Sequence, residues 1–203
     1  MTIKLDKPII KPGLLKDIQN RKSHRDFSPR SLDKNQISLI LWAAGGKKVD
    51  AVTSASRTVP SAGARYPIEL FLLVGEEAVK GIQAGFYHYS VENHSLELIF
   101  LGDKRKDVTI ASLGQEHIQN APVALVIAVD YKRTTSRYGS QRGIRYAHMD
   151  VGHACENVYL IVADLGLGTV EIGAFSDEDI KNVLHLAKNL QPLAIMPIGY
   201  TNK

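Results

Sequence analysis

Residues 57–70 read RTVPSAGARYPIEL, a loop of small side chains that runs directly into an apolar stretch. Pro60 and Pro67 stiffen the two ends of the loop, and residues 61–64 between them carry very little side chain. The stretch at 68–74 is typical of a buried strand. The loop can be a simple connector, or it can be a place where something flat and charged approaches the backbone.

Further strands are predicted after this one. The runs at 85–89 and 95–101 are joined by VENH, which is typical of a hairpin turn. The run at 122–130 is continuous and β-branched, as in a strand that is covered on both faces. Two further strands are predicted, a short one at 169–172 and the last at 192–199.

Helices are predicted before these strands and between them in the sequence. The longest, 143–165, is apolar around most of its circumference from Val151 on, which indicates a buried central helix. Cys155 lies within it and is interpreted as a small core residue rather than a nucleophile. A second helix is predicted to begin with Ser31 or Asp33 as its N-cap and to end at Gly45-Gly46. The remaining predicted helices are 13–22, 103–118 and 176–186, the last with Ser176 as its N-cap.

The order of these elements favours one fold class. Helices come first, a hairpin lies in the middle, and isolated strands alternate with helices later. This order predicts an α+β fold with helices packed on a mixed sheet, rather than a regular βαβ alternation. With 203 residues, 44% of them hydrophobic, the composition fits a single domain over residues 1–203.

Composition also narrows the classes of function. One cysteine allows no intrachain disulfide, which favours a reducing, cytoplasmic compartment. The first ten residues lack the apolar stretch of a signal peptide, and the apolar run at 121–129 is too short to span a bilayer. The net charge is +4, but the basic stretches 21–25 and 132–145 are far apart. We therefore expect no membrane or nucleic-acid partner, and a phosphorylated small molecule explains the charge equally well.

Several common catalytic motifs do not occur in the sequence. There is no P-loop, HExxH or GxSxG motif, and GLGTVE at 166–171 has Glu171 where a dinucleotide fingerprint needs its third glycine. His148 and His153 are five residues apart, on different faces of a helix, so no metal site is predicted. This pattern is typical of a protein whose cofactor performs the chemistry.

One short segment suits a phosphate group. RKSHR at 21–25 provides Arg21, Lys22, Ser23 and Arg25, three cations and a hydroxyl at the end of the first predicted helix. Arginine binds phosphate with two parallel hydrogen bonds, and serine can add another. The alternative is a solvated basic helix end, which the helix dipole also favours.

In combination with several blocks further along the chain, RKSHRDF resembles the opening of the nitroreductase-like FMN flavoproteins, and the whole chain resembles their SagB-type dehydrogenase branch. The resemblance extends from about residue 14 to residue 200. Its matching blocks are RKSHRDF (21–27), ISLILWAAGG (37–46), RTVPSAGARYPIEL (57–70), GFYHYSVENHSL (85–96), SRYGSQRGIRYAHMDVGHACENVYL (136–160), LGLGTVEIGAF (165–175) and PIGY (197–200).

The resemblance implies a nitroreductase-like α+β fold with a mostly antiparallel sheet, and an intertwined homodimer that binds FMN between its subunits. Ala64 stands where many nitroreductases have an asparagine that contacts the flavin. The implied cofactor residues are Arg21, Lys22, Ser23 and Arg25 at the phosphate, Pro60, Ser61, Ala62 and Ala64 along the flavin, Glu171, Ile172 and Gly173 near flavin N5, and Lys203 as a further phosphate contact.

The implied activity is oxidation of NADH or NADPH, with electrons passed to a nitroaromatic, a quinone or a similar acceptor. The flavin carries this chemistry, so no side chain is assigned as catalytic. The alternative is dehydrogenation of a peptide azoline, in which relatives use a Lys-Tyr pair as base. Arg137-Tyr138 stands there instead, and arginine is a poor base, so both residues are candidate contacts to the donor or the substrate. A third hypothesis is a non-catalytic protein that binds flavin or another small ligand.

Overall fold

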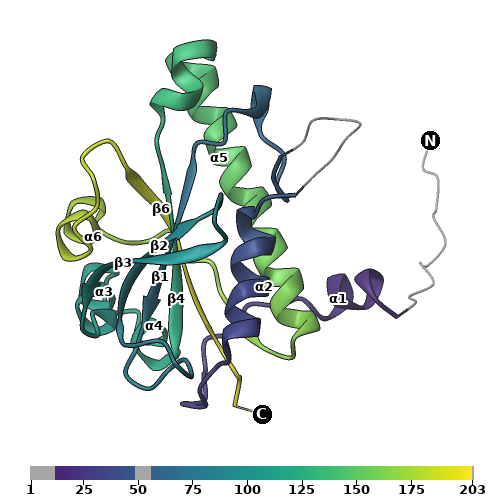
Figure 1. The fold of residues 1–203 in the computed structure, drawn as a ribbon, viewed down its shortest axis with the longest axis vertical. Helices are drawn as coiled ribbons and strands as arrows, with labels where there is room; N and C mark the ends of the chain where they lie inside the picture. Colours follow the sequence, from purple (N-terminus) through teal and green to yellow (C-terminus); the bar gives the residue numbers. More distant parts are fainter. Residues whose placement is uncertain (1–11, 49–55, 203) are drawn as a thin grey trace, which may run out of the picture.

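The computed structural model describes residues 12–48 and 56–202, and these contain one six-stranded sheet (Figure 1). The strand order is β3-β2-β1-β4-β6-β5, and every neighbouring pair is antiparallel. The α+β prediction is therefore confirmed. The strands are β1 (Ile68–Val74), β2 (Gly85–Ser90), β3 (Ser95–Leu101), β4 (Val123–Val129), β5 (Gly168–Thr169) and β6 (Gln191–Gly199).

Helices cover both faces of this sheet. Figure 1 shows α2 (Lys34–Gly45) and α5 (Lys132–Asp164) on one side, with α1 (Leu14–Asn20) next to the lower end of α5. On the other side lie α3 (Arg105–Ala111), α4 (His117–Asn120) and α6 (Asp177–Val183). The chain thus forms three layers, with the sheet in the middle.

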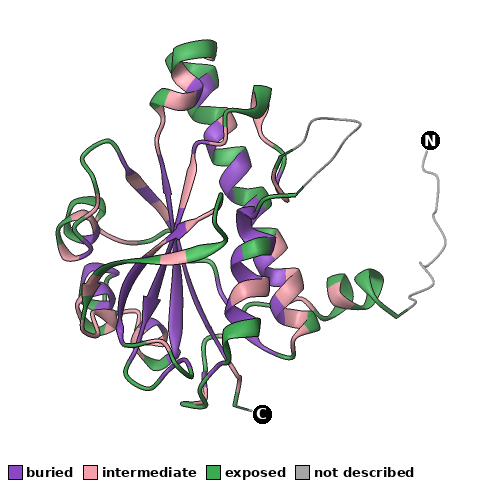
Figure 2. Cartoon of the chain, in the orientation of Figure 1, coloured by how far each residue is buried: buried purple, intermediate pink, exposed green. Residues whose placement is uncertain are grey.

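The two cores follow from the alternation of side chains along the strands. On β1, Leu70 and Leu72 pack toward α2 and α5, whereas Phe71 and Leu73 pack toward α3 and α6. Strand β4 is buried along its whole length between β1 and β6, as its continuous apolar sequence predicts. Figure 2 shows this burial concentrated in the central strands and on the inner side of α5.

Local signals explain where two of the helices begin. The carboxylate of Asp33 accepts the backbone N–H of Gln36 at 2.8 Å, and the Gln36 side chain accepts the N–H of Asp33 at 3.0 Å. This reciprocal capping box selects Asp33 over Ser31 as the cap of α2. At α6 the Ser176 hydroxyl accepts the N–H of Asp179, as predicted.

Two of the predicted helices are interrupted or divided in the structure. The helix predicted over 103–118 is divided into α3 and α4, because Leu113 and Gly114 adopt φ angles of 57° and 75°. Helix α5 begins at Lys132 rather than at residue 143, and it is interrupted at Gly139, where φ is 73° and ψ is 166°. The left-handed region is poorly accessible to most side chains, so each of these turns breaks the helix.

Helix α1 ends at Asn20 with Arg21 as its C-cap, so the basic segment RKSHR begins at the end of the first helix, which is two residues shorter there than predicted. Beyond it the chain runs beside β5, where the N–H of His24 donates to the carbonyl of Thr169 at 2.8 Å and Ser23 forms a parallel bridge with the same residue. The strand predicted over 169–172 is reduced to β5 and a separate bridge between Ile172 and Ile195. Among the described residues, no helix is both long enough and apolar enough to cross a membrane.

Candidate cofactor-binding site

The basic segment, residues 21–25, is held against α5 by Tyr159. The guanidinium of Arg21 lies 5.2 Å from the centroid of the Tyr159 ring, and Ser23 Oγ lies 3.1 Å from Tyr159 Oη. The same hydroxyl accepts the backbone N–H of Glu171 at 2.8 Å. Tyr159, a buried residue that the sequence analysis did not single out, therefore joins the basic segment to residues 171–173.

A hollow of about 190 Å³ opens beside this junction. Its lining includes Arg21, Lys22, Tyr159 and the glycine-rich turn at 166–168. The glycines of this turn allow its backbone to come close to a ligand in the hollow. At Gly168 a side chain would collide with His24, so glycine is required there. The two cations and the small volume suit a phosphate group.

Arg25 is not part of this hollow. It is exposed, and its charge acts instead on His117: burial lowers the pKa of that imidazole, and the Arg25 guanidinium lowers it further. The structure therefore brings Arg21 and Ser23 to Tyr159 and Lys22 to the hollow, whereas Arg25 neither lines the hollow nor contacts Tyr159.

The three residues predicted near flavin N5 differ in what their backbone can still bind. The N–H of Glu171 is used by Tyr159, and the N–H of Ile172 donates to the Ile195 carbonyl at 2.9 Å. Ile172 is also buried, so its N–H is not free for the predicted contact to a cofactor in this structure. Within the described part of the chain, the N–H of Gly173 has no hydrogen-bond acceptor, and this glycine is exposed. Gly173 is the residue of the three that can offer a donor to a ligand.

The loop formed by residues 60–66, here called the bare loop, turns through a short 3₁₀ segment at Ala62–Ala64. Gly63 and Ala64 adopt φ angles of 58° and 51°, which is strained for alanine. Within the loop, the Ser61 hydroxyl accepts the N–H of Tyr66 at 2.8 Å. The fold therefore holds the loop in one defined shape before any ligand is considered.

Arg137 and Tyr138 lie directly against the bare loop. A Cβ atom at position 63 would overlap the Tyr138 hydroxyl and would lie 3.5 Å from Arg137 Nε. The Tyr138 ring is supported by an edge-to-face contact with Tyr146 at 5.1 Å between centroids. Both residues belong to the first part of α5, before its interruption at Gly139, and not to a surface loop.

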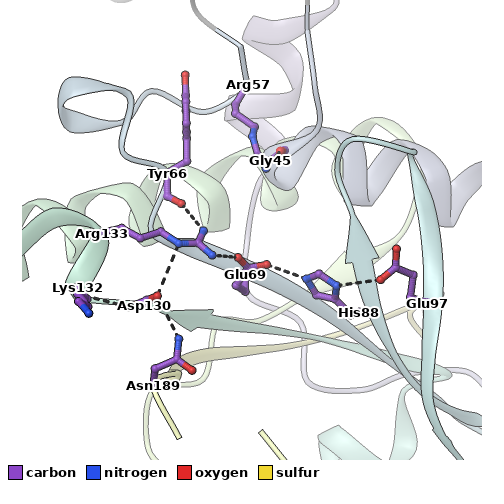
Figure 3. Close-up of polar contacts among 10 residues, drawn as sticks. All are labelled: Gly45, Arg57, Tyr66, Glu69, His88, Glu97, Asp130, Lys132, Arg133 and Asn189. Atoms are coloured by element: carbon purple, nitrogen blue, oxygen red, sulfur yellow. Dashed lines mark hydrogen bonds and ion pairs between the residues drawn. The ribbon is translucent and has the colours of Figure 1, made fainter. Parts of the chain in front are cut away.

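Arg133 anchors the end of the bare loop, as Figure 3 shows. Its guanidinium donates to the Tyr66 carbonyl at 2.9 Å and forms an ion pair with Glu69 at the start of β1. Arg65 in turn donates from Nε to the Arg133 carbonyl at 3.1 Å, so its guanidinium is directed toward α5. The bare loop is thus tied to both α5 and the sheet.

Beyond Arg133 and Glu69, further charged and polar side chains interact across the sheet, as Figure 3 also shows. Glu69 lies 2.7 Å from His88 Nε2, and His88 Nδ1 lies 3.7 Å from Glu97. Burial raises the pKa of Glu69, but the hydrogen bonds from His88 and Arg133 outweigh it and leave that pKa below its ordinary value. The hydrogen bond to Glu69 raises the pKa of His88 despite partial burial. The pair therefore favours the charged forms of both partners.

A second residue missed by the sequence analysis, Asp150, lies beneath the bare loop. It is 3% exposed, and its Oδ2 accepts no hydrogen bond from the described residues. Burial raises the pKa of Asp150, while the Ser61 hydroxyl, His153 and the Ala62 N–H oppose the rise. The only sequence signal was an acid within an otherwise apolar helix face.

The bare loop and the basic segment therefore contact α5 at different positions along the helix axis. Asp150 and Tyr159 are nine residues apart on this helix, a distance of about 14 Å along its axis. Lys203 lies outside the described residues. The described residues contain no group of three or more His, Cys, Asp or Glu side chains suited to a metal ion, and His148 is hydrogen-bonded to Tyr131 at 2.6 Å.

A cationic hollow and a structured loop on one long helix, beside an antiparallel sheet covered on both faces, define a nitroreductase-like protein. The chain belongs to the nitroreductase family, an oxidoreductase class, whose model matches residues 18–200.

Individual relatives agree with this assignment. A protein of Methanocaldococcus jannaschii named as a nitroreductase is 40% identical over 98% of this chain and 96% of its own length. The microcin B17-processing protein McbC of Escherichia coli is 27% identical over 96% of this chain and 76% of its own. A solved structure from Ralstonia eutropha, also named as a nitroreductase, superposes with a TM-score of 0.80 at 26% identity, over 99% of this chain and 88% of its own. The resemblance stated from the sequence is confirmed.

Proposed function

We propose that this protein is an FMN-dependent oxidoreductase that takes electrons from NADH or NADPH and passes them to a nitroaromatic, a quinone or a similar flat acceptor. The observation that carries the proposal is the junction at Tyr159. One buried hydroxyl holds Ser23 of the basic segment on one side and the backbone of Glu171 on the other. It thereby sets the cationic hollow and the unused N–H of Gly173 at fixed positions.

The residues present fit an FMN molecule. Arg21, Lys22 and Ser23 would hold its phosphate, and the N–H of Gly173 would donate to its ring system. The backbone of Pro60, Ser61, Ala62 and Ala64 would line the ring, since these small side chains allow close approach. Bound FMN supplies the redox chemistry by accepting a hydride and transferring electrons onward. The protein contributes positioning and preorganised donors.

The separation of the bare loop and the basic segment along α5 supports a flavin site completed by a second copy of the chain. A homodimer would place one subunit's loop opposite the other subunit's cationic hollow. We propose one domain over residues 1–203 that works as such a dimer in the cytoplasm, without a nucleic-acid or membrane partner.

A second function is favoured by two observations. McbC is named as a microcin B17-processing protein, and Tyr138 lies against the bare loop. FMN-dependent dehydrogenation of a peptide azoline, with oxygen as the acceptor, is therefore the alternative. Turnover of an azoline peptide without any nicotinamide would establish it, whereas rapid NADPH oxidation with no azoline turnover would exclude it.

The primary test is the absorbance of purified protein during titration with FMN and then, without oxygen, with NADH and NADPH. We expect saturable FMN binding and bleaching of the flavin by at least one donor. Protein that does not bind FMN would contradict the proposal. Bound flavin that neither donor reduces would indicate a binding protein without this activity.

The phosphate assignment is tested by a pair of arginine variants. Arg21→Ala removes a charge-assisted contact worth about 1.5–3 kcal/mol, so FMN affinity should fall by about 10- to 100-fold. Arg137→Ala should change FMN affinity far less, because Arg137 lies at the bare loop and not in the hollow. Equal losses of affinity in both variants would mean that the phosphate site is misplaced.

A further inference from the structure

A hollow of about 600 Å³ lies between α2, the turn at 79–83 and the β2–β3 hairpin. It shares no lining residue with the hollow beside Tyr159. Its volume is within the range of small-molecule sites, roughly 300–1,000 Å³. The proposed function makes no use of it.

The floor of this hollow is apolar. Ile37 and Leu41 are one helical turn apart on the same face of α2, and Ile82 and Leu96 approach from the turn and the hairpin. The Tyr87 ring adds an aromatic wall, and its hydroxyl donates to the Gln83 carbonyl at 2.8 Å. The floor can therefore remove an apolar ligand body from water.

One side of the hollow carries a chain of polar groups. His94 Nε2 lies 2.7 Å from Ser38 Oγ, and His94 Nδ1 lies 2.7 Å from the hydroxyl of the buried Tyr89. His94 adopts a φ of 46°, an uncommon backbone state that these two bonds help to maintain. When His94 carries its proton on Nε2, Ser38 accepts a hydrogen bond from it and keeps its own O–H as a donor for a ligand, while Nδ1 accepts from the Tyr89 hydroxyl.

The rim of the hollow is cationic. Lys34 Nζ would lie 3.1 Å from a Cβ at Gly81, so the ammonium is positioned over the backbone of this turn. Lys34 forms no ion pair with a carboxylate of the described residues, and no Asp or Glu lines the hollow. Among the described residues, the Lys34 ammonium therefore has no carboxylate within ion-pairing distance.

We propose that this hollow binds a small carboxylate with an apolar body. The carboxylate pairs with Lys34 and accepts a hydrogen bond from the Ser38–His94 side, while the apolar body lies on Ile37, Leu41, Ile82 and Leu96. A single acid at one end of an apolar molecule matches a site with one cation at one end of an apolar floor. The site is separate from the flavin and stands whether or not FMN is bound.

The test uses 4-phenylbutyrate and its uncharged analogue 4-phenylbutyramide, titrated into the full-length protein with and without FMN. Calorimetry gives the affinities, and backbone amide shifts locate the site. We expect saturable binding, with the carboxylate about tenfold tighter than the amide, and shifts at residues 34–41 and 81–96. Equal affinities, no saturation at millimolar probe, or displacement of FMN by the probe would overturn the proposal.

Two variants, with one control, test whether Lys34 and the apolar floor contribute to binding of the probes. Lys34→Met should abolish the preference for the carboxylate, whereas Lys188→Met, at an exposed lysine outside the hollow, should leave it unchanged. Ile82→Trp should fill the floor and weaken binding of both probes, with folding checked by circular dichroism. Retention of the preference in Lys34→Met, or of both affinities in a folded Ile82→Trp protein, would overturn the assignment.

Discussion

Two buried polar side chains on α5 organise the candidate site. Tyr159 satisfies its hydroxyl with Ser23 and Glu171, which lie far from one another in sequence. Asp150 lies beneath the bare loop with one oxygen that has no partner among the described residues. Buried polar groups without partners are costly, so such a residue marks either strain or a role in function.

The Asp150 carboxyl leads to a prediction about pH. Its pKa is raised in the folded state, so the unfolded chain loses this proton first as the pH rises. The free energy of unfolding therefore falls as the pH rises from the pKa of the unfolded chain, about 4, to the raised pKa of the folded state. Above that pH this contribution stays constant. Asp150→Asn removes this titration. The melting temperature of the variant should therefore rise relative to that of the wild type across this pH range. The expected change is about 2–4 °C for each kcal/mol of unfolding free energy that the wild type loses.

A control for this effect lies on the same helix. Glu156 is exposed, so Glu156→Gln should leave the shape of the melting-temperature curve against pH unchanged. Parallel curves for Asp150→Asn and the wild type over the whole window would show that Asp150 titrates normally. That outcome would contradict the prediction.

At the scale of elements, the bare loop depends on contacts from α5. Arg133 in the first turn of α5 holds the Tyr66 carbonyl and pairs with Glu69. Arg133→Met removes both contacts, so we expect faster amide hydrogen exchange at residues 61–66 and FMN affinity lowered several-fold. Exchange measured by mass spectrometry and FMN titration together check this result.

Arg145 provides the matched variant for this experiment. It is an exposed arginine on the same helix, and Arg145→Met should leave both the exchange rates and FMN affinity unchanged. Unchanged exchange in Arg133→Met would mean that the loop keeps its shape without the anchor. The anchoring role would then be wrong, although the flavin proposal would stand.

The element boundaries show where sequence reasoning stops. Strands β1, β4 and β6 were predicted closely, since their apolar runs are continuous and bounded by turn residues. The helix predicted over 103–118 was divided because Leu113, not only Gly114, takes a positive φ. Leucine rarely takes that state, so its local preference does not signal the break.

At the scale of the whole molecule, one face carries exposed apolar side chains. Leu14, Leu15 and Ile18 on α1 are 61%, 44% and 52% exposed, and Trp42 on α2 is 42% exposed. A hollow of about 550 Å³ between α1, α2 and α5 lies at this face. Exposed apolar side chains of this size beside a hollow suit contact with a second copy of the chain.

The dimer proposal is therefore tested at α1. Leu14→Asp combined with Ile18→Asp should halve the molecular mass measured by light scattering and weaken FMN binding, because charges would be buried at the interface. Ile110→Asp is the control, since Ile110 is 68% exposed on α3, across the sheet from α1. A dimer that survives the α1 double substitution would place the interface elsewhere.

The sequence by itself determined the α+β class, most strands, the buried long helix and the basic character of the candidate site. These properties depend on periodicity, turn residues and residue type, which are local. Only the tertiary structure decided that Tyr159 joins Ser23 to Glu171, that the N–H of Ile172 is used by Ile195, and that Arg65 is directed to α5. The physical reason is that each depends on partners distant in sequence, and pairing across such distances is set by how helices and strands pack.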